Sequence, residues 1–478
     1  MRAPLTIACA GVLSLACSTN PPPQVREDLG IEVPATWTAG GAAAGSGQEM
    51  PAIQVEWWRE FGDERLAGLV THGLEHNQNL RASLARLQAA NAAQTIAGAP
   101  LLPEVDLGLQ ADRSRRLFLG FPFGGGGTPS STFTSYGLSL GVRWELDVWG
   151  RLRAADSASL ADQQAAIEDL QAARLSLSAQ ICRAWFLAIE TNQQLDLANA
   201  TADAFAKTYG DVLDRFRRGV RPALEVHQAA TNLADARANI AKRRDLHARA
   251  MRRLDVLVGR YPTGKQDITR ALPAALPALP AGLPSEPLRR RPDLRAAERR
   301  VAAAGCRVDA AEAALYPRLS LTASGGTQSL DLEDLVDTDF RIWSLGANLL
   351  EPLFRGGALR AEVERQQARR AEAFANYGNT VLTAFAEVED ILNSKVELVI
   401  QRDGLVDAAK HARYARDLAR ERWQLGLTDF LSVADGQRRA FLTESARLQA
   451  DLQLIENRID LLLALGGSFG ESPPEGSR

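Results

Sequence analysis

The clearest pattern along the chain is an alternation of apolar and polar positions over about thirteen residues. From Tyr136 onward every second residue is apolar, and small or polar residues fill the gaps; the apolar set is Leu138, Leu140, Val142, Trp144, Leu146 and Val148. A period of two predicts a β-strand with one apolar and one polar face. Tyr136 and Trp149 stand at the two ends of the apolar stripe, where a lipid-facing strand carries its aromatic residues.

Three weaker segments have the same alternation. They start at Val105, at Leu319 and at Leu345, so the sequence predicts four strands in all. The smallest single-chain membrane barrels use about eight strands, and four cannot close one. If these strands face lipid, the chain must therefore form an oligomer.

Helical patterns occupy most of the remaining sequence. A first helix is predicted from Trp57 to Ala99, where Pro100 stops it. No proline occurs between Pro129 and Pro222, or between Pro352 and Pro473, so each interval can hold helices of about fifty residues, on the order of 75 to 90 Å long. Within the first interval a heptad seam is predicted at Leu160, Ile167, Leu170, Leu177, Ile181 and Ala188.

The sequence contains an internal duplication. Residues 216–226 (FRRGVRPALEV) return roughly 207 positions later as residues 423–433 (WQLGLTDFLSV), with a shared aromatic-x-x-Gly-x-x-x-x-Leu-x-Val frame. Each copy carries a pair of alternating strands followed by a long proline-free helical stretch. Gly219 and Gly426 are expected to form tight turns between helices, and Gly150 and Gly356 to connect strand to helix.

These patterns predict the domain organisation. A signal peptide occupies residues 1–16 and a lipid-anchored extended leader residues 17–60, because the short apolar run ends at Cys17 in a lipobox-like segment (LSLAC). The alternative is an ordinary signal peptide with an incidental cysteine. The first repeat follows at 61–271, a proline-rich linker at 272–290, the second repeat at 291–467 and a flexible tail at 468–478.

Composition and charge exclude several functions. The net charge of -3 and the absence of a basic stripe interleaved with aromatic residues argue against a nucleic-acid partner. Cys182 and Cys306 have no metal-like or disulfide-like spacing and are expected to be buried small apolar residues. His72 and His76 share a helix face, but no third ligand accompanies them. We therefore expect no metal, no cofactor and no enzymatic activity.

Four segments resemble the outer-membrane factor (TolC-like) family, in particular the lipoprotein outer-membrane components of tripartite efflux pumps. They are residues 290–298 (RRPDLRAAE), 314–321 (ALYPRLSL), 352–357 (PLFRGG) and 426–433 (GLTDFLSV). The resemblance implies an α+β membrane protein in which three chains, with four strands each, form a 12-stranded outer-membrane β-barrel that continues as a long periplasmic α-helical barrel.

The resemblance also implies a function and partners. The homotrimer would be a passive exit duct in outer-membrane lipid, extending into the periplasm and served by a periplasmic adaptor protein and a proton-driven inner-membrane pump. The adaptor would dock at the Gly219 and Gly426 turns. The exported substrate is left open. A periplasmic coiled-coil scaffold or adaptor without a pore is the alternative function.

The family's periplasmic gate residues match Leu431 and Asp435, with Arg438 one turn further on. A ring of leucines closes a pore by dewetting, and a ring of carboxylates narrows it and raises the pKa of each Asp435 through mutual repulsion. Gln228 is the counterpart of Asp435 in the first copy. Ser432 stands where some members have a second gate aspartate, and residues 434–436 (ADG) are smaller than the common Leu-Asp-Ala, so a less charged or looser gate is expected. An exposed helix residue without a pore role is the alternative interpretation of Asp435.

Overall fold

The structure is a computed structural model, and it describes residues 37–38, 56–117, 130–269, 271–273 and 290–467. The chain divides into two compact units. Within the described residues, one unit contains residues 87–166 and 297–377, and the other contains the remainder, including both helical turns of the duplicated frame.

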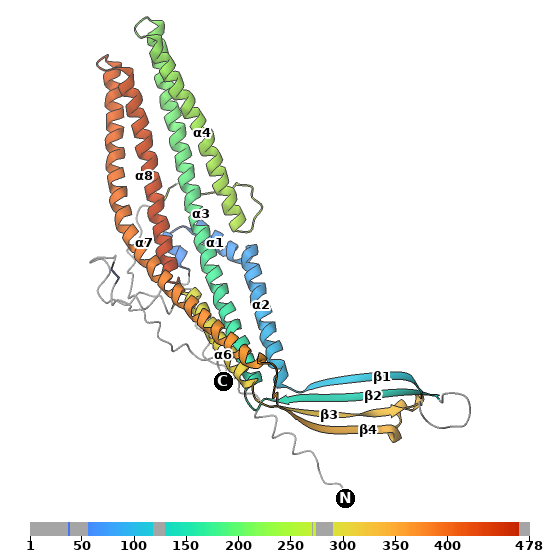
Figure 1. The fold of residues 1–478 in the computed structure, drawn as a ribbon. Helices are drawn as coiled ribbons and strands as arrows, with labels where there is room; N and C mark the ends of the chain where they lie inside the picture. Colours follow the sequence, from blue (N-terminus) through green and yellow to red (C-terminus); the bar gives the residue numbers. More distant parts are fainter. Residues whose placement is uncertain (1–36, 39–55, 118–129, 270, 274–289, 468–478) are drawn as a thin grey trace, which may run out of the picture. The chain divides into compact units, whose positions relative to one another are not determined.

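The first unit is built on one antiparallel sheet. Its strands are β1 (Glu104–Leu117), β2 (Ser130–Leu146), β3 (Arg318–Ser329) and β4 (Arg341–Leu350), in the spatial order β1-β2-β3-β4 (Figure 1). Two short 3-10 turns, η4 (Glu333–Val336) and η5 (Thr338–Phe340), join β3 to β4. The four predicted strands are confirmed, and each is longer at one end or both than its alternation indicated.

The apolar side chains of this sheet are left exposed by the single chain. Leu107 is 74% exposed, Trp343 81% and Leu345 77%. Each outer strand, β1 and β4, has one hydrogen-bonding edge without a partner strand among the described residues. An apolar exposed sheet with two open edges is incomplete in water and requires both an apolar surrounding and neighbouring strands.

The predicted end of the second strand at Val148 is wrong by two residues. Strand β2 ends at Leu146, because Asp147 turns to cap the next helix instead of pairing with β3. Its carboxylate accepts hydrogen bonds from the backbone N–H groups of Leu152 and Arg153, both at 2.9 Å. Gly150, with a φ of 79°, makes the sharp change of direction possible.

The two copies contain helices of identical length. Helix α3 (Arg151–Arg217) and helix α7 (Ala358–Gln424) have 67 residues each, and α4 (Ala223–Leu257) and α8 (Phe430–Ala464) have 35 each. Figure 1 shows α4 following α3, and α8 following α7, through a tight turn. The duplication therefore extends to complete hairpins, and the long helices exceed the fifty residues expected from proline spacing.

The predicted heptad seam holds over only part of α3. Leu170, Leu177, Ile181 and Ala188 are buried, but Ile167 is 39% exposed, and Ala161 and Ala165 are buried beside it instead. In this part of the helix the small side chains of Ala161 and Ala165, and not that of Ile167, form the contact face.

The helix predicted from residues 57 to 99 is divided into η2 (Trp57–Phe61), α1 (Glu64–His76), α2 (Gln78–Gly98) and η3 (Ala99–Leu101). The break falls at Asn77, whose side chain accepts from the backbone N–H of Leu80 at 3.1 Å and donates to the carbonyl of Leu257 at 2.8 Å. The second copy opens with α6 (Pro292–Ala313). Within the described residues, no helix combines the length and the apolar composition needed to cross a bilayer.

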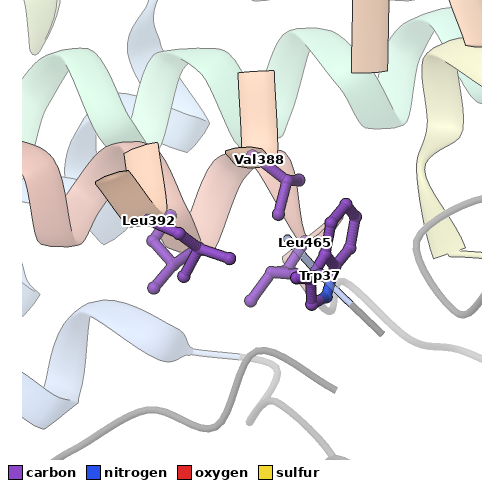
Figure 2. Close-up of a cluster of buried hydrophobic side chains, with 6 residues drawn as sticks. Trp37, Val388, Leu392 and Leu465 are labelled. Atoms are coloured by element: carbon purple, nitrogen blue, oxygen red, sulfur yellow. The ribbon is translucent and has the colours of Figure 1, made fainter. Parts of the chain in front are cut away.

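The expected leader, residues 17–60, is not extended throughout. Trp37 is 5% exposed and packs among Val388, Leu392, Leu461, Ala464 and Leu465, as Figure 2 shows, and Thr38 donates twice to the Glu389 carboxylate. Trp57 and Trp58 are also buried, at the start of η2. The Gly, Pro and Ala content around these residues predicted an extended chain, but large aromatic side chains gain more from burial than the backbone loses.

The two internal cysteines are buried, as predicted. Cys182 is 0% exposed and Cys306 3%. Burial raises the pKa of the Cys182 thiol well above its usual range. Such a thiol stays protonated at neutral pH, so it behaves as a small apolar residue.

Candidate gate site

Both helical hairpins turn at a glycine in the left-handed backbone region. Gly219 has a φ of 74° and Gly426 a φ of 77°. The following N–H groups return to the ends of the preceding helices: Val220 donates to the carbonyl of Arg215 at 2.9 Å, and Leu427 to that of Arg422 at 2.8 Å. This pattern ends a helix tightly and favours glycine. The predicted turns are confirmed, and they bring the proposed gate residues to the ends of the hairpins.

An aromatic cluster lies beneath the second turn. Trp423 and Phe430 are 1% and 2% exposed, and they pack with Val212, Ala229 and Val433 from three helices. Arg215 lies over the Trp423 ring, 4.2 Å from its centroid, and donates to the carbonyls of Trp423 and Gln424 at 3.2 and 3.0 Å. The aromatic position shared by the two frames is evident from the sequence. The sequence does not indicate that only the aromatic residue of the second copy is buried.

Helix α8 begins with a side-chain cap. Asp429 accepts a hydrogen bond from the backbone N–H of Ser432 at 2.9 Å and another from the Ser432 hydroxyl. These bonds lower the pKa of Asp429 below its usual range. Ser432, at the position of a second gate aspartate in some family members, therefore supports the helix start, whereas Pro222 in the first copy offers no such cap.

The three predicted gate residues occupy successive turns on one side of α8. Leu431 is 65% exposed, Asp435 follows four residues later, and Arg438 a further turn along. Asp435 accepts hydrogen bonds from Arg438 at 2.9 Å and from Arg439 at 2.6 Å. Arg439 was not anticipated from the sequence.

Within the single chain, the pKa of Asp435 shifts opposite to the direction that repulsion among three carboxylates would produce. The hydrogen bonds from Arg438 and Arg439 lower the pKa of Asp435, because two cations stabilise the ionised carboxylate. Each chain thus neutralises its own carboxylate, and mutual repulsion between copies has less charge to act on.

Gly436 lies where α7 and α8 of one hairpin pack together. A Cβ atom at this position would lie 3.2 Å from the Cα of Arg416 on α7, closer than an ordinary contact. The small residue therefore lets α7 and α8 pack closely. This contact lies within one chain, so a looser gate between chains stays a prediction.

A groove of about 710 Å³ connects the two copies at this level. Its lining comes from α3, α4 and α8, and includes both Asp435 and its counterpart Gln228. The exposed Leu431 also borders the groove. The structure thus brings Asp435 of the second copy and its first-copy counterpart Gln228 into one groove.

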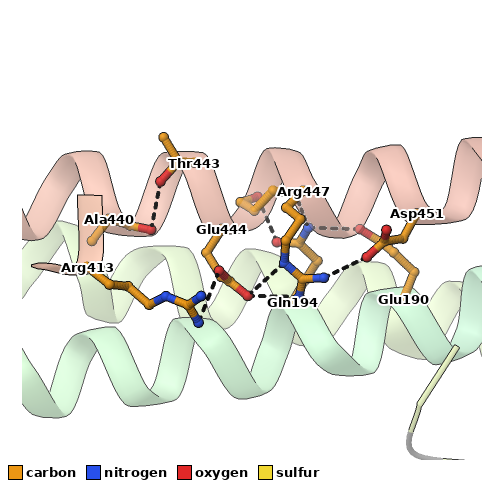
Figure 3. Close-up of polar contacts among 9 residues, drawn as sticks. Glu190, Gln194, Arg413, Ala440, Thr443, Glu444, Arg447 and Asp451 are labelled. Atoms are coloured by element: carbon orange, nitrogen blue, oxygen red, sulfur yellow. Dashed lines mark hydrogen bonds and ion pairs between the residues drawn. The ribbon is translucent and has the colours of Figure 1, made fainter. Parts of the chain in front are cut away.

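A buried polar seam joins α3 to α8 about one turn beyond the groove. Gln194 is 0% exposed; its amide donates to the Glu190 carboxylate at 2.8 Å and to the Ser445 carbonyl at 3.0 Å, and the Ser445 hydroxyl donates back at 2.8 Å. On α8, Arg447 bonds both Glu444 and Asp451 (Figure 3). Burial raises the pKa of Glu190. The sequence analysis did not identify this seam.

His72 and His76 lie one turn apart on the same face of α1. The rings of His72 and His76 stack, with centroids 4.1 Å apart, and the Nδ1 of His76 lies 3.0 Å from the His72 carbonyl oxygen. Stacked rings do not converge on a shared ligand position. In the described part of the chain, no group of three or more metal-ligating side chains occurs. Cys17, the predicted lipid attachment site, lies outside the described residues.

Known proteins share this fold and sequence over nearly the whole chain. The family model described as outer membrane efflux protein matches residues 69–260 and 283–467, one match for each repeat. The pyoverdine export outer membrane protein OpmQ of Pseudomonas aeruginosa is 32% identical, with 97% of each chain covered. The toluene efflux pump outer membrane protein TtgF of Pseudomonas putida is 31% identical, over 97% of this chain and 96% of the relative.

Solved structures agree with this assignment. The outer-membrane channel OprN superposes with a TM-score of 0.84 and 29% identity, over 95% of this chain and 100% of that structure. The fold is therefore that of outer-membrane efflux channels, a class of ducts and not of enzymes. The chain belongs to the outer membrane efflux protein family. It is the outer-membrane component of an efflux system, located in the outer membrane and extending into the periplasm.

Proposed function

We propose that three copies of this chain form a passive exit duct whose periplasmic end is gated by the start of α8. The observation that carries the gate is the row of Leu431, Asp435 and Arg438 on one exposed side of α8, directly after the Gly426 turn. The open edges of β1 and β4 support the trimer, because three four-stranded sheets supply enough strands to close a membrane barrel.

The gate works through an apolar ring and a charged ring. Three copies of Leu431 narrow the pore with apolar side chains, which expel water from a constriction. One turn further, Asp435 is held by Arg438 and Arg439, so this ring is made of ion pairs instead of bare carboxylates. Opening then requires the α8 starts to separate, and Leu431 provides the main barrier to ions.

The hairpin turns at Gly219 and Gly426 are the proposed docking points for a periplasmic adaptor. Val220, Leu425 and Leu427, which flank the two glycines, are 65% to 68% exposed, so each turn presents apolar side chains to a partner. An inner-membrane pump, proton-driven, supplies the energy through that adaptor. Cys17 is the proposed acyl attachment site, and Cys17→Ser should abolish acyl labelling while the trimer still assembles.

The cargo is chosen upstream of the duct. The relatives named for pyoverdine export and for toluene efflux are 32% and 31% identical to this chain, although a siderophore and an aromatic solvent have little chemistry in common. Near-equal similarity to ducts with such different cargo favours selection by the pump. The passage itself accepts both polar and apolar molecules.

Single-channel recording in planar bilayers tests the gate. Replacing Leu431 and Asp435 together with Ala should raise the conductance of the purified trimer, because the apolar ring and the ion-paired ring are both removed. Leu224→Ala is the matched control: it is the first-copy counterpart of Leu431 and equally exposed, at 65%. Unchanged conductance in the double variant, or an equal rise in the control, would place the gate elsewhere.

A further inference from the structure

The groove between α4 and α8 has the size and the lining of a small-molecule site. Its volume of about 710 Å³ lies within the range of pockets that hold small organic ligands. We propose that it binds an uncharged aromatic molecule with a hydroxyl or similar hydrogen-bond donor. This proposal rests on the gate function above, because the groove borders the proposed gate residues.

Aromatic side chains form the apolar part of the groove. Phe205 of α3 lies at the base, and Phe430 and Phe441 of α8 line one wall. Phe430 is buried in the cluster beneath the turn, whereas Phe205 and Phe441 are half-buried and keep ring surface open to the groove. Rings of this kind stack edge or face against an aromatic ligand, which gives them an orientation preference that aliphatic walls lack.

A polar row on α4 forms the opposite wall. Gln228, Asn232 and Asn239 supply amide groups at helical spacing, and Thr231 adds a hydroxyl. Asp235 stands in the middle of this row as a hydrogen-bond acceptor. Amides beside aromatic rings suit a ligand with an apolar body and a polar end, and the carboxylate suits a hydroxyl donor.

The charges in the groove favour an uncharged ligand. Asp435 is paired with Arg438 and Arg439, so it attracts a second cation weakly. Arg438 itself lines the groove and opposes a cation drawn toward Asp235. An anion is repelled by the carboxylate of Asp235, which lines the same groove. A neutral molecule avoids both penalties and still reaches the amides.

A bound ligand would bridge the two copies at the gate. Gln228 on α4 and Asp435 on α8 line the same groove, so a molecule between them contacts one side chain from each copy. The occupied groove would hold α4 and α8 at a fixed separation. A ligand at this place therefore alters passage without entering the apolar ring.

Photolabelling of the intact trimer in lipid nanodiscs tests the proposal. The probes are three benzophenones with one reactive core: uncharged 4-hydroxybenzophenone, anionic 4-benzoylbenzoate and a cationic trimethylammonium derivative. We expect saturable labelling by the uncharged probe at peptides containing residues 228–239 and 430–442, at least ten-fold stronger than by either charged probe. Equal labelling by the three probes, or labelling confined to other peptides, would overturn the proposal.

Variants separate groove binding from general adsorption to apolar surface. Phe205→Ala should weaken the apparent affinity about ten-fold, the size of one lost aromatic contact with its packing. Thr231→Trp, at an exposed lining position, should fill the groove and abolish labelling without disturbing a buried residue. Ala241→Trp, exposed on the same helix but outside the groove, is the matched control and should label like the native chain. Labelling that survives Thr231→Trp would refute the site.

The labelling result does not depend on the gate. If the trimer conducts and Leu431 proves not to control conductance, the gate proposal fails while specific labelling still supports a ligand site. If conductance responds to Leu431 and no saturable labelling occurs in the groove, the ligand site fails alone. With both intact, 4-hydroxybenzophenone should change the single-channel conductance of the native chain and not that of Thr231→Trp, each normalised to its own conductance.

Discussion

The two hairpins of this chain have the same lengths and the same turn, yet they bury different side chains. In the second copy Trp423 is 1% exposed, whereas its counterpart Phe216 is 41% exposed. Phe430 is 2% exposed where the first copy has the exposed Ala223. The helix start is capped by Asp429 in one copy and formed by Pro222 in the other.

This comparison distinguishes the residues that build both helical hairpins from the residues in which the two copies differ. The two copies form hairpins of equal length and share the glycine, leucine and valine positions of the turn, so the differing side chains do not alter the backbone of the wall. The positions that differ place the aromatic core and the ion-paired carboxylate in the second copy, and the amide of Gln228 in the first. A duplicated fold can thus keep its backbone while only one copy carries the residues of the proposed gate.

The largest expected effect comes from removing the buried aromatic of the second copy. Trp423→Ala should destabilise the hairpin end by about 3 to 5 kcal/mol, because it leaves a cavity among Val212, Phe430 and Val433 and removes the ring beneath Arg215. Hydrogen exchange of backbone amides near residues 420–432 measures the local opening free energy.

Phe216→Ala is the matched control for this change. Because Phe216 is 41% exposed, its removal should cost under about 1 kcal/mol. Equal protection losses in the two variants would show that Phe216 is buried in the assembled protein, and the asymmetry described here would then belong to the single chain alone.

Replacing the glycine of either turn should cause a smaller loss of stability, and the loss should be the same at both turns. Gly219→Ala and Gly426→Ala each place a Cβ atom on a residue with φ near 75°, which costs about 1 to 2 kcal/mol. No heavy atom would contact either added Cβ within 4 Å, so the penalty is conformational and the same in both copies. Unequal changes in amide exchange at the two turns would contradict this symmetry.

Periodicity and local chemistry were sufficient to predict the elements of the fold. Alternation located the four strands, proline spacing located the long helices, and the repeated Gly219 and Gly426 identified both turns. Each of these features depends on the backbone preference of single residues or on the apolar face of a single helix or strand. Both can be read directly from a sequence.

Features that depend on a distant partner were missed or misjudged. Trp37 is buried because α7 and α8 offer an apolar recess some 350 residues away along the chain, and its own neighbours give no sign of this. Within one chain Arg438 and Arg439 both lower the pKa of Asp435, and the contribution of Arg439 was not evident from the sequence. The packing role of Gly436 likewise depends on the approach of Arg416.

A still smaller stability effect distinguishes equivalent glutamates of α3 and α7. Glu190 is 5% exposed in the polar seam, whereas its counterpart Glu397 is exposed. Burial raises the pKa of Glu190, and the hydrogen bond from Gln194 and the charge of Arg243 offset this only in part. At a pH between its unfolded and folded pKa values, Glu190 is ionised in the unfolded chain but still protonated in the folded chain. The folded state is therefore destabilised by this group as the pH rises through that range.

Glu190→Gln should therefore raise the thermal midpoint at pH 7, since the amide oxygen can still accept the bond from Gln194 without a buried charge. The gain should shrink as the pH falls toward the ordinary range of a glutamate, where the native side chain is protonated in both states. Glu397→Gln should change neither value. A loss of stability at pH 7 in Glu190→Gln would show that the ionised carboxylate supports the seam.

The smallest expected effect is the pH response of the proposed gate. Arg438 and Arg439 lower the pKa of Asp435, so the ion pairs are present above the usual aspartate pKa and are lost only as the pH falls through the lowered value. Single-channel conductance should then stay constant from pH 5 to pH 8, in the native chain and in Asp435→Asn alike. A conductance step in this range that disappears in Asp435→Asn would mean that three carboxylates repel one another strongly enough to overcome their arginines. In that case the charge of the gate is set by the assembled ring and not by the single chain. The electrostatic difference between Asp435 and Gln228 would then be larger than the structure of one chain indicates.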